Sequence, residues 1–379
     1  MMYCHLMKVL RWSSFTFFDD WFKDGRPQGP SMPQDRKPKR SDRGRQRNRR
    51  RYGGPRKVNL IEQSKKELLE YNQRANDRFD YEKTGIQPVG LPDNPSDAKS
   101  FSFMWKCNPV RLSDEEKMAD FVVRKGEFGW LDDERVDEIE DFAEPLSISA
   151  DQALSLRSAL LQQKTVYGHS TMRNRGRQIH RDYKQGMSVV ELSKKYDFPP
   201  MNIFRQILAE KGWSKTKIKE AVRAPSRFSN RERKEFEAAE EADRVSNVDQ
   251  SETHLRADVF ENILADWFEE QGVRLRRQPE LVKEQSIEIG GPKLTPDILF
   301  LDHVEINGQP VAWIDAKHFY GADVGFQRKK MQKQMMRYIN EWGSGAIVFR
   351  HGFSENLYMA GVTMLDAGPL DLSELQNRP

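Results

Sequence analysis

Apolar and polar residues alternate most regularly between positions 294 and 321, and this alternation predicts two β-strands. The first apolar run covers residues 298–306, and the second covers residues 311–317. Asn307-Gly308 separates the two runs, and these residue types tolerate the positive φ angles that a type I′ turn needs. The sequence therefore predicts an antiparallel hairpin that pairs 298–306 with 311–317.

Charged residues interrupt both runs at one end. Successive side chains of a strand point to opposite faces, so Trp313, Asp315 and Lys317 are expected to share one face. Asp297 precedes the first run, and antiparallel pairing brings it opposite the end of the second run. The pattern thus places Asp297, Asp315 and Lys317 at one point of the predicted sheet.

Helical periodicity flanks the hairpin on both sides. Residues 255–272 carry apolar positions at helical spacing and end at a glycine, which predicts an amphipathic helix. Glu261 lies on this helix, and its carboxylate can lean over the same point of the sheet. In a second predicted helix, at residues 324–342, Gln334 and Tyr338 are four positions apart and share a face.

Two further short runs, residues 273–278 and 345–350, predict strands, and residues 279–293 are expected to form a loop. The resulting order is α-β-β-β-α-β, with a helix on each side of a mixed sheet. Residues 250–371 are therefore predicted to form one α/β domain.

A helical, helix-turn-helix-like module is predicted for residues 155–225. Ser188 followed by Glu191 has the pattern of a capping box, and "DFPP" then separates this helix from a second helical face. Four basic residues precede these helices, and we call them the arginine group: Arg173, Arg175, Arg177 and Arg181. Such modules contact DNA in some proteins and only join protein elements in others, and the sequence leaves both roles open.

Composition and charge change the picture for residues 1–150. The whole chain is 37% hydrophobic and 32% charged, a balance that predicts a partly unfolded chain. Residues 114–144 contain thirteen acids against four bases. We therefore expect residues 1–150 to be mainly disordered.

A basic arm lies at residues 36–57, where twelve Lys and Arg stand against one acid. It includes Arg49, Arg50 and Arg51. We interpret it as a nucleic-acid-binding arm or a nuclear import signal, with a solvated tail as the alternative.

Cysteine usage favours the inside of the cell. Cys4 and Cys107 cannot build a disulfide framework, and no Cys/His group has the spacing of a structural zinc site. The first 22 residues make a poor signal sequence, and no run approaches the roughly 20 apolar residues of a membrane span. A soluble protein of the nucleus is expected, with the cytoplasm as an alternative, and whether Met1 is the true start stays open. Scattered histidines leave zinc as a minor alternative: His303, His318 and His351.

The charged residues of the hairpin form a known motif. Pro296-Asp297 followed by Asp315-Ala316-Lys317 resembles the PD-(D/E)xK nuclease superfamily. The bare motif is not specific, because Pro92-Asp93 followed by Glu115-Glu116-Lys117 also satisfies it, in an acidic segment without strand periodicity. The strand, turn, strand and helix around the later match favour it over the earlier one.

A closer resemblance is to the TPD-motif family, the codanin-interacting nucleases. It rests on Thr295-Pro296-Asp297, on "WIDAK" at 313–317 and on the stretch from Gln334 through Tyr338 to Gly352-Phe353. It extends over about residues 165–370. Members of that family carry Glu where this chain has Asp315, which is one methylene shorter.

The resemblance implies a restriction-endonuclease-like core that hydrolyses phosphodiester bonds of nucleic acid with Mg²⁺ or Mn²⁺. DNA is the preferred expectation for the partner, and the sequence leaves open whether DNA or RNA is cut. The implied metal ligands are Asp297, Asp315, Glu261 and the carbonyl of Ala316. Lys317 would orient the attacking water and offset negative charge, while Gln334 and Tyr338 would complete the site. The family also implies a codanin-like scaffold protein as a partner. The alternative is an inactive nuclease fold that serves as an adaptor or as a nucleic-acid-binding subunit.

Overall fold

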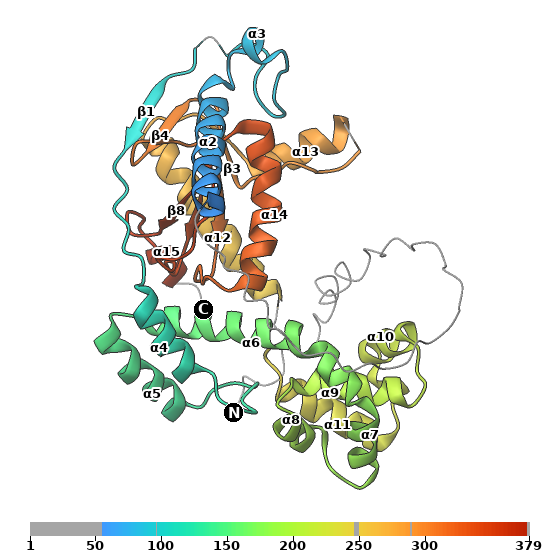
Figure 1. Cartoon of the computed structure of the whole chain (residues 1–379). Coiled ribbons are helices and arrows are strands. Elements are labelled where there is room, and N and C mark those ends of the chain that lie inside the picture. Colours follow the sequence, from blue (N-terminus) through green and yellow to red (C-terminus); the bar gives the residue numbers. More distant parts are fainter. Residues whose placement is uncertain (1–54, 96, 246–249, 289, 377–379) are drawn as a thin grey trace, which may run out of the picture. The chain divides into compact units, whose positions relative to one another are not determined.

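The computed structural model describes residues 55–95, 97–245, 250–288 and 290–376, which form helices and two β-sheets (Figure 1). Residues 64–379 form one compact unit. Most of the predicted basic arm, including Arg49, Arg50 and Arg51, lies outside the described residues. None of the described helices combines the length and the apolar composition that a transmembrane segment needs.

The larger of the two sheets has five strands. They are β2 (Leu275–Arg277), β3 (Ile298–Phe300), β6 (Trp313–Lys317), β7 (Gly345–Phe349) and β8 (Val362–Asp366). Their spatial order is β2-β3-β6-β7-β8, so β6 is central. β3 is antiparallel to both β2 and β6, whereas β6, β7 and β8 are parallel, and the sheet is therefore mixed, as predicted.

A helix covers each face of this sheet, as the sequence predicts. On one face, α12 (Gln250–Glu270) packs Phe260 and Leu264 against Ile314. On the other face, α14 (Gly325–Trp342) packs Met335 against Trp313 and Ile347. Alternate residues of β6 thus belong to different hydrophobic cores. Burying each large apolar side chain stabilises the fold by about 1.5–3 kcal/mol.

The Asn307-Gly308 turn is confirmed, with φ angles of 53° and 74°. It joins β4 (His303–Ile306) to β5 (Gln309–Pro310). The predicted pairing of 298–306 with 311–317 is confirmed in part, because Ile298 and Leu299 pair with Ile314 and Trp313, and Val311 N donates to Val304 O at 2.8 Å. The prediction of one continuous first strand is wrong, because the chain breaks between β3 and β4.

Asp302 explains this break. Its carboxylate is fully buried and accepts the backbone N–H groups of Lys99 and Arg274, each at 2.8 Å. A buried carboxylate needs such donors. Asp302 meets them between the end of β3 and the start of β4, where the chain leaves the five-stranded sheet. The loop expected at 279–293 also differs, since α13 (Gln278–Glu288) occupies most of it.

The hairpin belongs to a second sheet of three strands, in the order β1-β4-β5, in which β1 (Ser100–Phe103) runs parallel to β4. α2 (Pro55–Asp77) and α3 (Tyr81–Thr84) precede β1, and α15 (Ser373–Gln376) follows β8.

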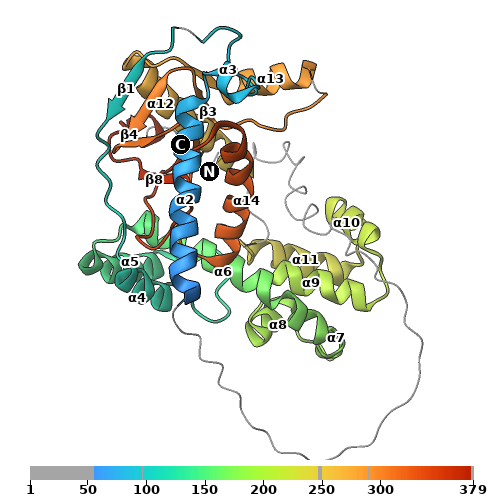
Figure 2. The same ribbon diagram turned by 45° about the horizontal axis from the view of Figure 1, so that its top comes forward.

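The C-terminal half of α2 lies beside α14, as both views show (Figures 1 and 2). Ser344 N, just after α14, donates to Tyr71 O at 3.0 Å. Gly343 has a φ of 84°, and a Cβ added there would lie 2.2 Å from Ala75 N. Only glycine allows α2 to approach this turn so closely.

The structure differs from the expected disorder over the described part of residues 1–150. The acidic segment forms α4 (Leu112–Val122), α5 (Asp133–Ala143) and a short 3₁₀ helix, η2 (Glu144–Leu146). Met118 and Ile139 are fully buried in a core shared with the first turns of the following helix. Acids on the exposed faces of these helices outnumber the apolar residues. A count of composition therefore does not reveal that the apolar residues recur at helical spacing.

The remaining helices form most of the region between α5 and α12. They are α6 (Ala150–Asn174), α7 (Gly176–Lys184), α8 (Val189–Tyr196), α9 (Pro200–Glu210), α10 (Lys215–Arg223), η3 (Pro225–Arg227) and α11 (Asn230–Glu241). Figure 2 shows α7 to α11 gathered together, and they share one apolar core around Phe204 and Ile207 of α9. The capping box of Ser188 and Glu191 at the start of α8 is present as predicted.

Candidate functional site

Asp297 stands at the start of β3 and is held on both of its carboxylate oxygens. Ala316 N donates to Oδ2 at 2.6 Å, and Gln278 Nε2 donates to Oδ1 at 2.8 Å. The first bond crosses from β3 to β6, because these strands are antiparallel and pair Ile298 with Ile314. It brings Asp297 to the segment Asp315-Ala316-Lys317, as the sequence predicts.

Asp315 lies on the central strand and is almost inaccessible, at 1% exposure. Gln334 Nε2 of α14 donates to its Oδ1 at 3.0 Å. Its Oδ2 forms an ion pair with Lys317 Nζ but has no hydrogen bond in the described structure. Asp315 and Lys317 therefore share a strand face, and one oxygen of Asp315 keeps unused capacity as an acceptor.

Gln334 and Tyr338 line the same place, as their spacing predicts. Gln334 Nε2 also approaches Tyr338 Oη at 3.3 Å, and Tyr338 Oη donates to Thr295 O at 3.2 Å. Burial and then the charge of Asp315 raise the pKa of Tyr338 to about 12. Tyr338 thus stays protonated at neutral pH and serves as a donor.

The acids of the site repel one another. Burial and then the charge of Asp315 raise the pKa of Asp297 well above its ordinary value. Burial, followed by the charge of Asp258, raises the pKa of Glu261 to about 7. Burial lowers the pKa of Lys317, but the charges of Asp315 and Asp297 outweigh this and raise it to about 12. The fold therefore disfavours the charged forms of Asp297 and Glu261, even with Lys317 close by.

Glu261 reaches the site by charge rather than by direct contact. It lies on α12, which covers the opposite face of β6 from α14, and both Asp315 and Lys317 influence its pKa. The described residues contain no group of three or more His, Cys, Asp or Glu side chains that could hold a metal ion. The donor set of Asp297 and Asp315 nevertheless has the hard oxygen ligands that Mg²⁺ prefers, and a cation would relieve their repulsion.

Gln278 is a residue of the site that sequence reasoning missed. Its backbone N–H donates to Asp297 O at 3.1 Å, in addition to the side-chain bond to Oδ1. The available signal was its position: Arg277 pairs with Ile298, so the next residue must stand opposite Asp297. Each acid thus has one oxygen fixed by a glutamine amide.

The histidines do not form a zinc site within the described chain. His303 lies on β4 against Phe79, with ring centroids 4.9 Å apart. His318 and His351 stand close to each other, with ring centroids 5.8 Å apart. They lie beside the acidic site rather than in it.

The earlier match to the nuclease motif is not assembled. Its acids, Glu115 and Glu116, lie on α4 rather than on a strand. Glu115 is buried and Glu116 is exposed, so they face different ways. This part of the chain therefore offers no paired carboxylates.

The arginine group is exposed along the end of α6 and on α7. By contrast α9, the second helix of the predicted helix-turn-helix, lies at the centre of its bundle, and Ala209 is its only exposed residue. α9 therefore has little free surface for a nucleic-acid groove. A role of this region in binding nucleic acid stays a prediction, and it would rest on the arginine group.

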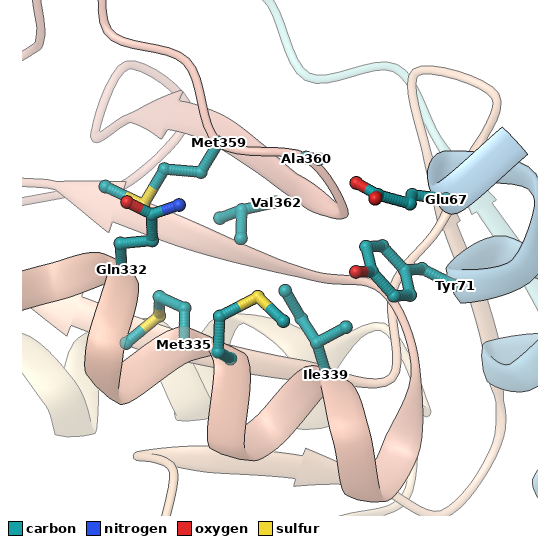
Figure 3. Close-up of a pocket in the computed structure, with 9 residues that line it drawn as sticks. Glu67, Tyr71, Gln332, Met335, Ile339, Met359, Ala360 and Val362 are labelled. Atoms are coloured by element: carbon teal, nitrogen blue, oxygen red, sulfur yellow. The ribbon is translucent and has the colours of Figure 1, made fainter. Parts of the chain in front are cut away.

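A hollow of about 320 Å³ opens between α2, α14 and the loop before β8 (Figure 3). Met335, Ile339 and Met359 give it an apolar lining, and Glu67 is the only acid among the described side chains that line it. It lacks the paired carboxylates that hydrolysis of a phosphodiester needs, so we do not assign catalysis to it.

Comparison with known proteins supports the resemblance. Residues 229–367 match the family described as "Protein of unknown function TPD sequence-motif". This match contains the whole five-stranded sheet and begins after α6 to α10, so it covers less than the expected 165–370.

Curated relatives match over part of their length. An uncharacterized protein of Acanthamoeba polyphaga mimivirus is 28% identical over 141 residues, which cover 35% of this chain and 50% of that protein. CDAN1-interacting nuclease 1 of Danio rerio is 28% identical over 102 residues, covering 26% of this chain and 34% of the relative. The Gallus gallus protein of the same name is 28% identical over 99 residues, covering 25% and 36%. No solved structure matches the chain.

Proposed function

We propose that this chain, whose residues 229–367 match the TPD sequence-motif family, is a metal-dependent nuclease that hydrolyses phosphodiester bonds of nucleic acid. The observation that carries this proposal is the hydrogen bond of 2.6 Å from Ala316 N to Asp297 Oδ2. It joins the two halves of the motif that the family resemblance singles out. The relatives named as nucleases support the same reaction class.

The core would then be restriction-endonuclease-like. Its mixed sheet has α12 on one face and α14 on the other, and both acids stand where the antiparallel β3 meets the central β6. The mixed sheet between two helices supports this proposal.

Asp297 and Asp315 would hold a Mg²⁺ or Mn²⁺ ion together with the carbonyl of Ala316. The N–H and C=O of one strand residue point to the same edge, so the bond from Ala316 N to Asp297 also directs the Ala316 carbonyl toward Asp297. Glu261 would add a carboxylate from α12. The bound ion would make a water molecule more acidic and offset charge on the phosphate.

The protein's own residues would orient the reaction. Gln278 and Gln334 each fix the Oδ1 oxygen of one acid. Oδ2 of Asp297 accepts from Ala316 N, and Oδ2 of Asp315 is paired with Lys317. Lys317, protonated at neutral pH, would offset the negative charge that develops on the phosphate and orient the attacking water. Tyr338 would hold the loop at Thr295 in place.

Nucleic acid would be bound through basic surfaces outside the acidic site. The arginine group is exposed and close to α8 and α9, and the basic arm at residues 36–57 would add phosphate contacts. We propose DNA as the substrate and the nucleus as the location, because the arm also resembles an import signal.

A second candidate function is that of an inactive adaptor bound to a codanin-like scaffold. Two observations favour it: relatives are named for interaction with CDAN1, and Lys317 already neutralises one oxygen of Asp315. An adaptor needs the fold but no metal affinity.

A cleavage panel separates the two functions. Labelled single-stranded, duplex and branched DNA and RNA would be incubated with the protein and Mg²⁺ or Mn²⁺, beside the Asp315→Asn variant and the Glu116→Gln control. Cleavage by the unmodified protein and the control, but not by Asp315→Asn, would support the nuclease. No cleavage of any substrate, together with no heat of Mn²⁺ binding in calorimetry, would favour the adaptor.

A further inference from the structure

Basic side chains gather at the C-terminal ends of β6 and β7, beside the candidate site. Lys317 ends β6 and is in register with Phe349, which ends β7. His318 and Arg350 are the next residues, and Arg350 N donates to Lys317 O at 2.8 Å. Neighbouring strands lie about 4.8 Å apart, so His318 and Arg350 leave the sheet close to Lys317.

The guanidinium of Arg350 has no carboxylate ion pair among the described residues. Its Nη1 instead contacts Nε2 of His318, and the positive charge of Arg256 on α12 acts on it as well. The charge of Asp151 also reaches Arg350, but that carboxylate is 3.7 Å from His351 Nδ1 and its side chain is 73% exposed. Water therefore screens the one negative charge in this cluster.

Burial makes this arrangement unfavourable without a further anion. Arg350 and His351 are both partly buried, and burial is the main cause that lowers the pKa of each. A partly desolvated cation gains most from an anion that also accepts its hydrogen bonds. A guanidinium offers two parallel N–H donors, which match the oxygens of a phosphate group.

A cavity of about 740 Å³ opens at these side chains. It lies between the end of β7 and the start of α6, and its lining includes Arg350, His351, Ser149, Asp151 and Gln152. The space is thus sufficient for a phosphate and the sugar attached to it.

Two further acids line this cavity, and both are already engaged. Asp366 accepts the N–H of Asn108 at 2.7 Å and that of Gly368 at 3.0 Å. Asp114 forms an ion pair with Lys117 at 2.9 Å. These acids therefore oppose an anion near Arg350 less than free carboxylates would.

We propose that Arg350 and His351, with His318 orienting the guanidinium, form a phosphate-binding subsite for the nucleic-acid chain whose phosphodiester bond lies at Asp297 and Asp315. This inference rests on the proposed function. The shared chemistry is a phosphate oxyanion, which comes either from an internal phosphodiester or from a terminal phosphomonoester of the substrate.

The test measures binding separately from cleavage. Fluorescent oligonucleotides with and without a terminal phosphate would be titrated in EDTA against the full chain and the Arg350→Gln and Arg350→Lys variants. The matched control is Arg227→Gln, an exposed arginine paired with Glu220 at 3.0 Å in the helical bundle. We expect Arg350→Gln to weaken binding about tenfold. The plot of log K against log salt should become shallower, its slope losing about 0.7 in magnitude. Arg350→Lys should recover part of the affinity at an unchanged melting temperature, and Arg227→Gln should bind like the unmodified protein.

The outcomes distinguish this inference from the proposed function. If the protein cleaves nucleic acid and Arg350→Gln binds it as tightly as the unmodified protein, the subsite is refuted while the nuclease stands. If binding depends on Arg350 but no substrate is cleaved, the subsite stands and the hydrolytic function fails. A loss of affinity only for oligonucleotides with a terminal phosphate identifies the terminal group as the ligand, and an equal loss for both identifies an internal phosphodiester.

Discussion

Replacing Glu261 with Gln is expected to stabilise the protein in the absence of metal at pH 8. The raised pKa of Glu261 means that its charged form is less favourable in the folded protein than in the unfolded chain. The penalty is absent below the ordinary pKa of 4.5, grows as the pH rises and is complete above the folded pKa of about 7. Gln has nearly the same shape and carries no charge, so the variant avoids the penalty.

The size of the effect follows from this shift. A rise in the pKa from 4.5 to about 7 corresponds at most to about 3.5 kcal/mol, at roughly 1.4 kcal/mol for each pKa unit. Glu261 is only partly buried, so water screens part of this energy, and we expect about 1–2 kcal/mol. In a domain of this size each kcal/mol raises the melting temperature by roughly 2–4 °C.

The assay is thermal melting in EDTA at pH 8 and pH 4.5. Glu261→Gln should melt a few degrees higher than the unmodified protein at pH 8 and at the same temperature at pH 4.5. Glu116→Gln, on the exposed face of α4, removes a carboxylate that belongs to no cluster and should change neither value. With added Mg²⁺ the unmodified protein should gain more stability than Glu261→Gln. A lower melting temperature for Glu261→Gln at pH 8 would refute the reasoning, because it would mean that the charge is favourable in the fold.

Other replacements test the remaining parts of the site. Asp315→Asn and Lys317→Ala should both abolish cleavage, but Mn²⁺ titration by calorimetry should show lost metal affinity only for the Asn variant, because Lys has no ligand oxygen. Gln278→Ala removes the hydrogen bond to Asp297 Oδ1 and should lower kcat at least tenfold with KM nearly unchanged. An unchanged kcat in steady-state kinetics would show that the amide does not position Asp297. Changing the whole arginine group to Ala should raise the Kd for DNA and leave Tm nearly constant, since these side chains are exposed; a fall in Tm without a change in Kd, measured by melting and anisotropy, would give the group a structural role.

The sequence predicts the site best where local chemistry decides the structure. Asn307-Gly308 needs only its own φ angles, and the alternation of Trp313, Asp315 and Lys317 needs only the period of a strand. The spacing of Gln334 and Tyr338 follows in the same way from the helix. The local sequence is therefore enough to predict these elements, without the residues that they contact elsewhere in the chain.

The features that were missed depend on partners far along the chain. The strand break at Asp302 requires donors from Lys99 and Arg274, and Gln278 enters the site only because β2 pairs with β3. The helices of the acidic segment form because Met118 meets residues beyond α5. Such contacts leave no periodic trace in a single sequence.

Residues far apart in the sequence pack together in the core, and this affects how the chain can fold during synthesis on the ribosome. β1 leaves the ribosome long before β4, its partner, and Tyr71 long before the Ser344 that it contacts. The 199 residues between Phe103 and His303 take roughly 10–40 s at typical translation rates. During that interval the helices α7 to α11 can close around their own core, whereas Trp105 and its neighbours wait for α12 and the sheet. The apolar side chains around Trp105 therefore stay without their core partners until most of the protein has been made.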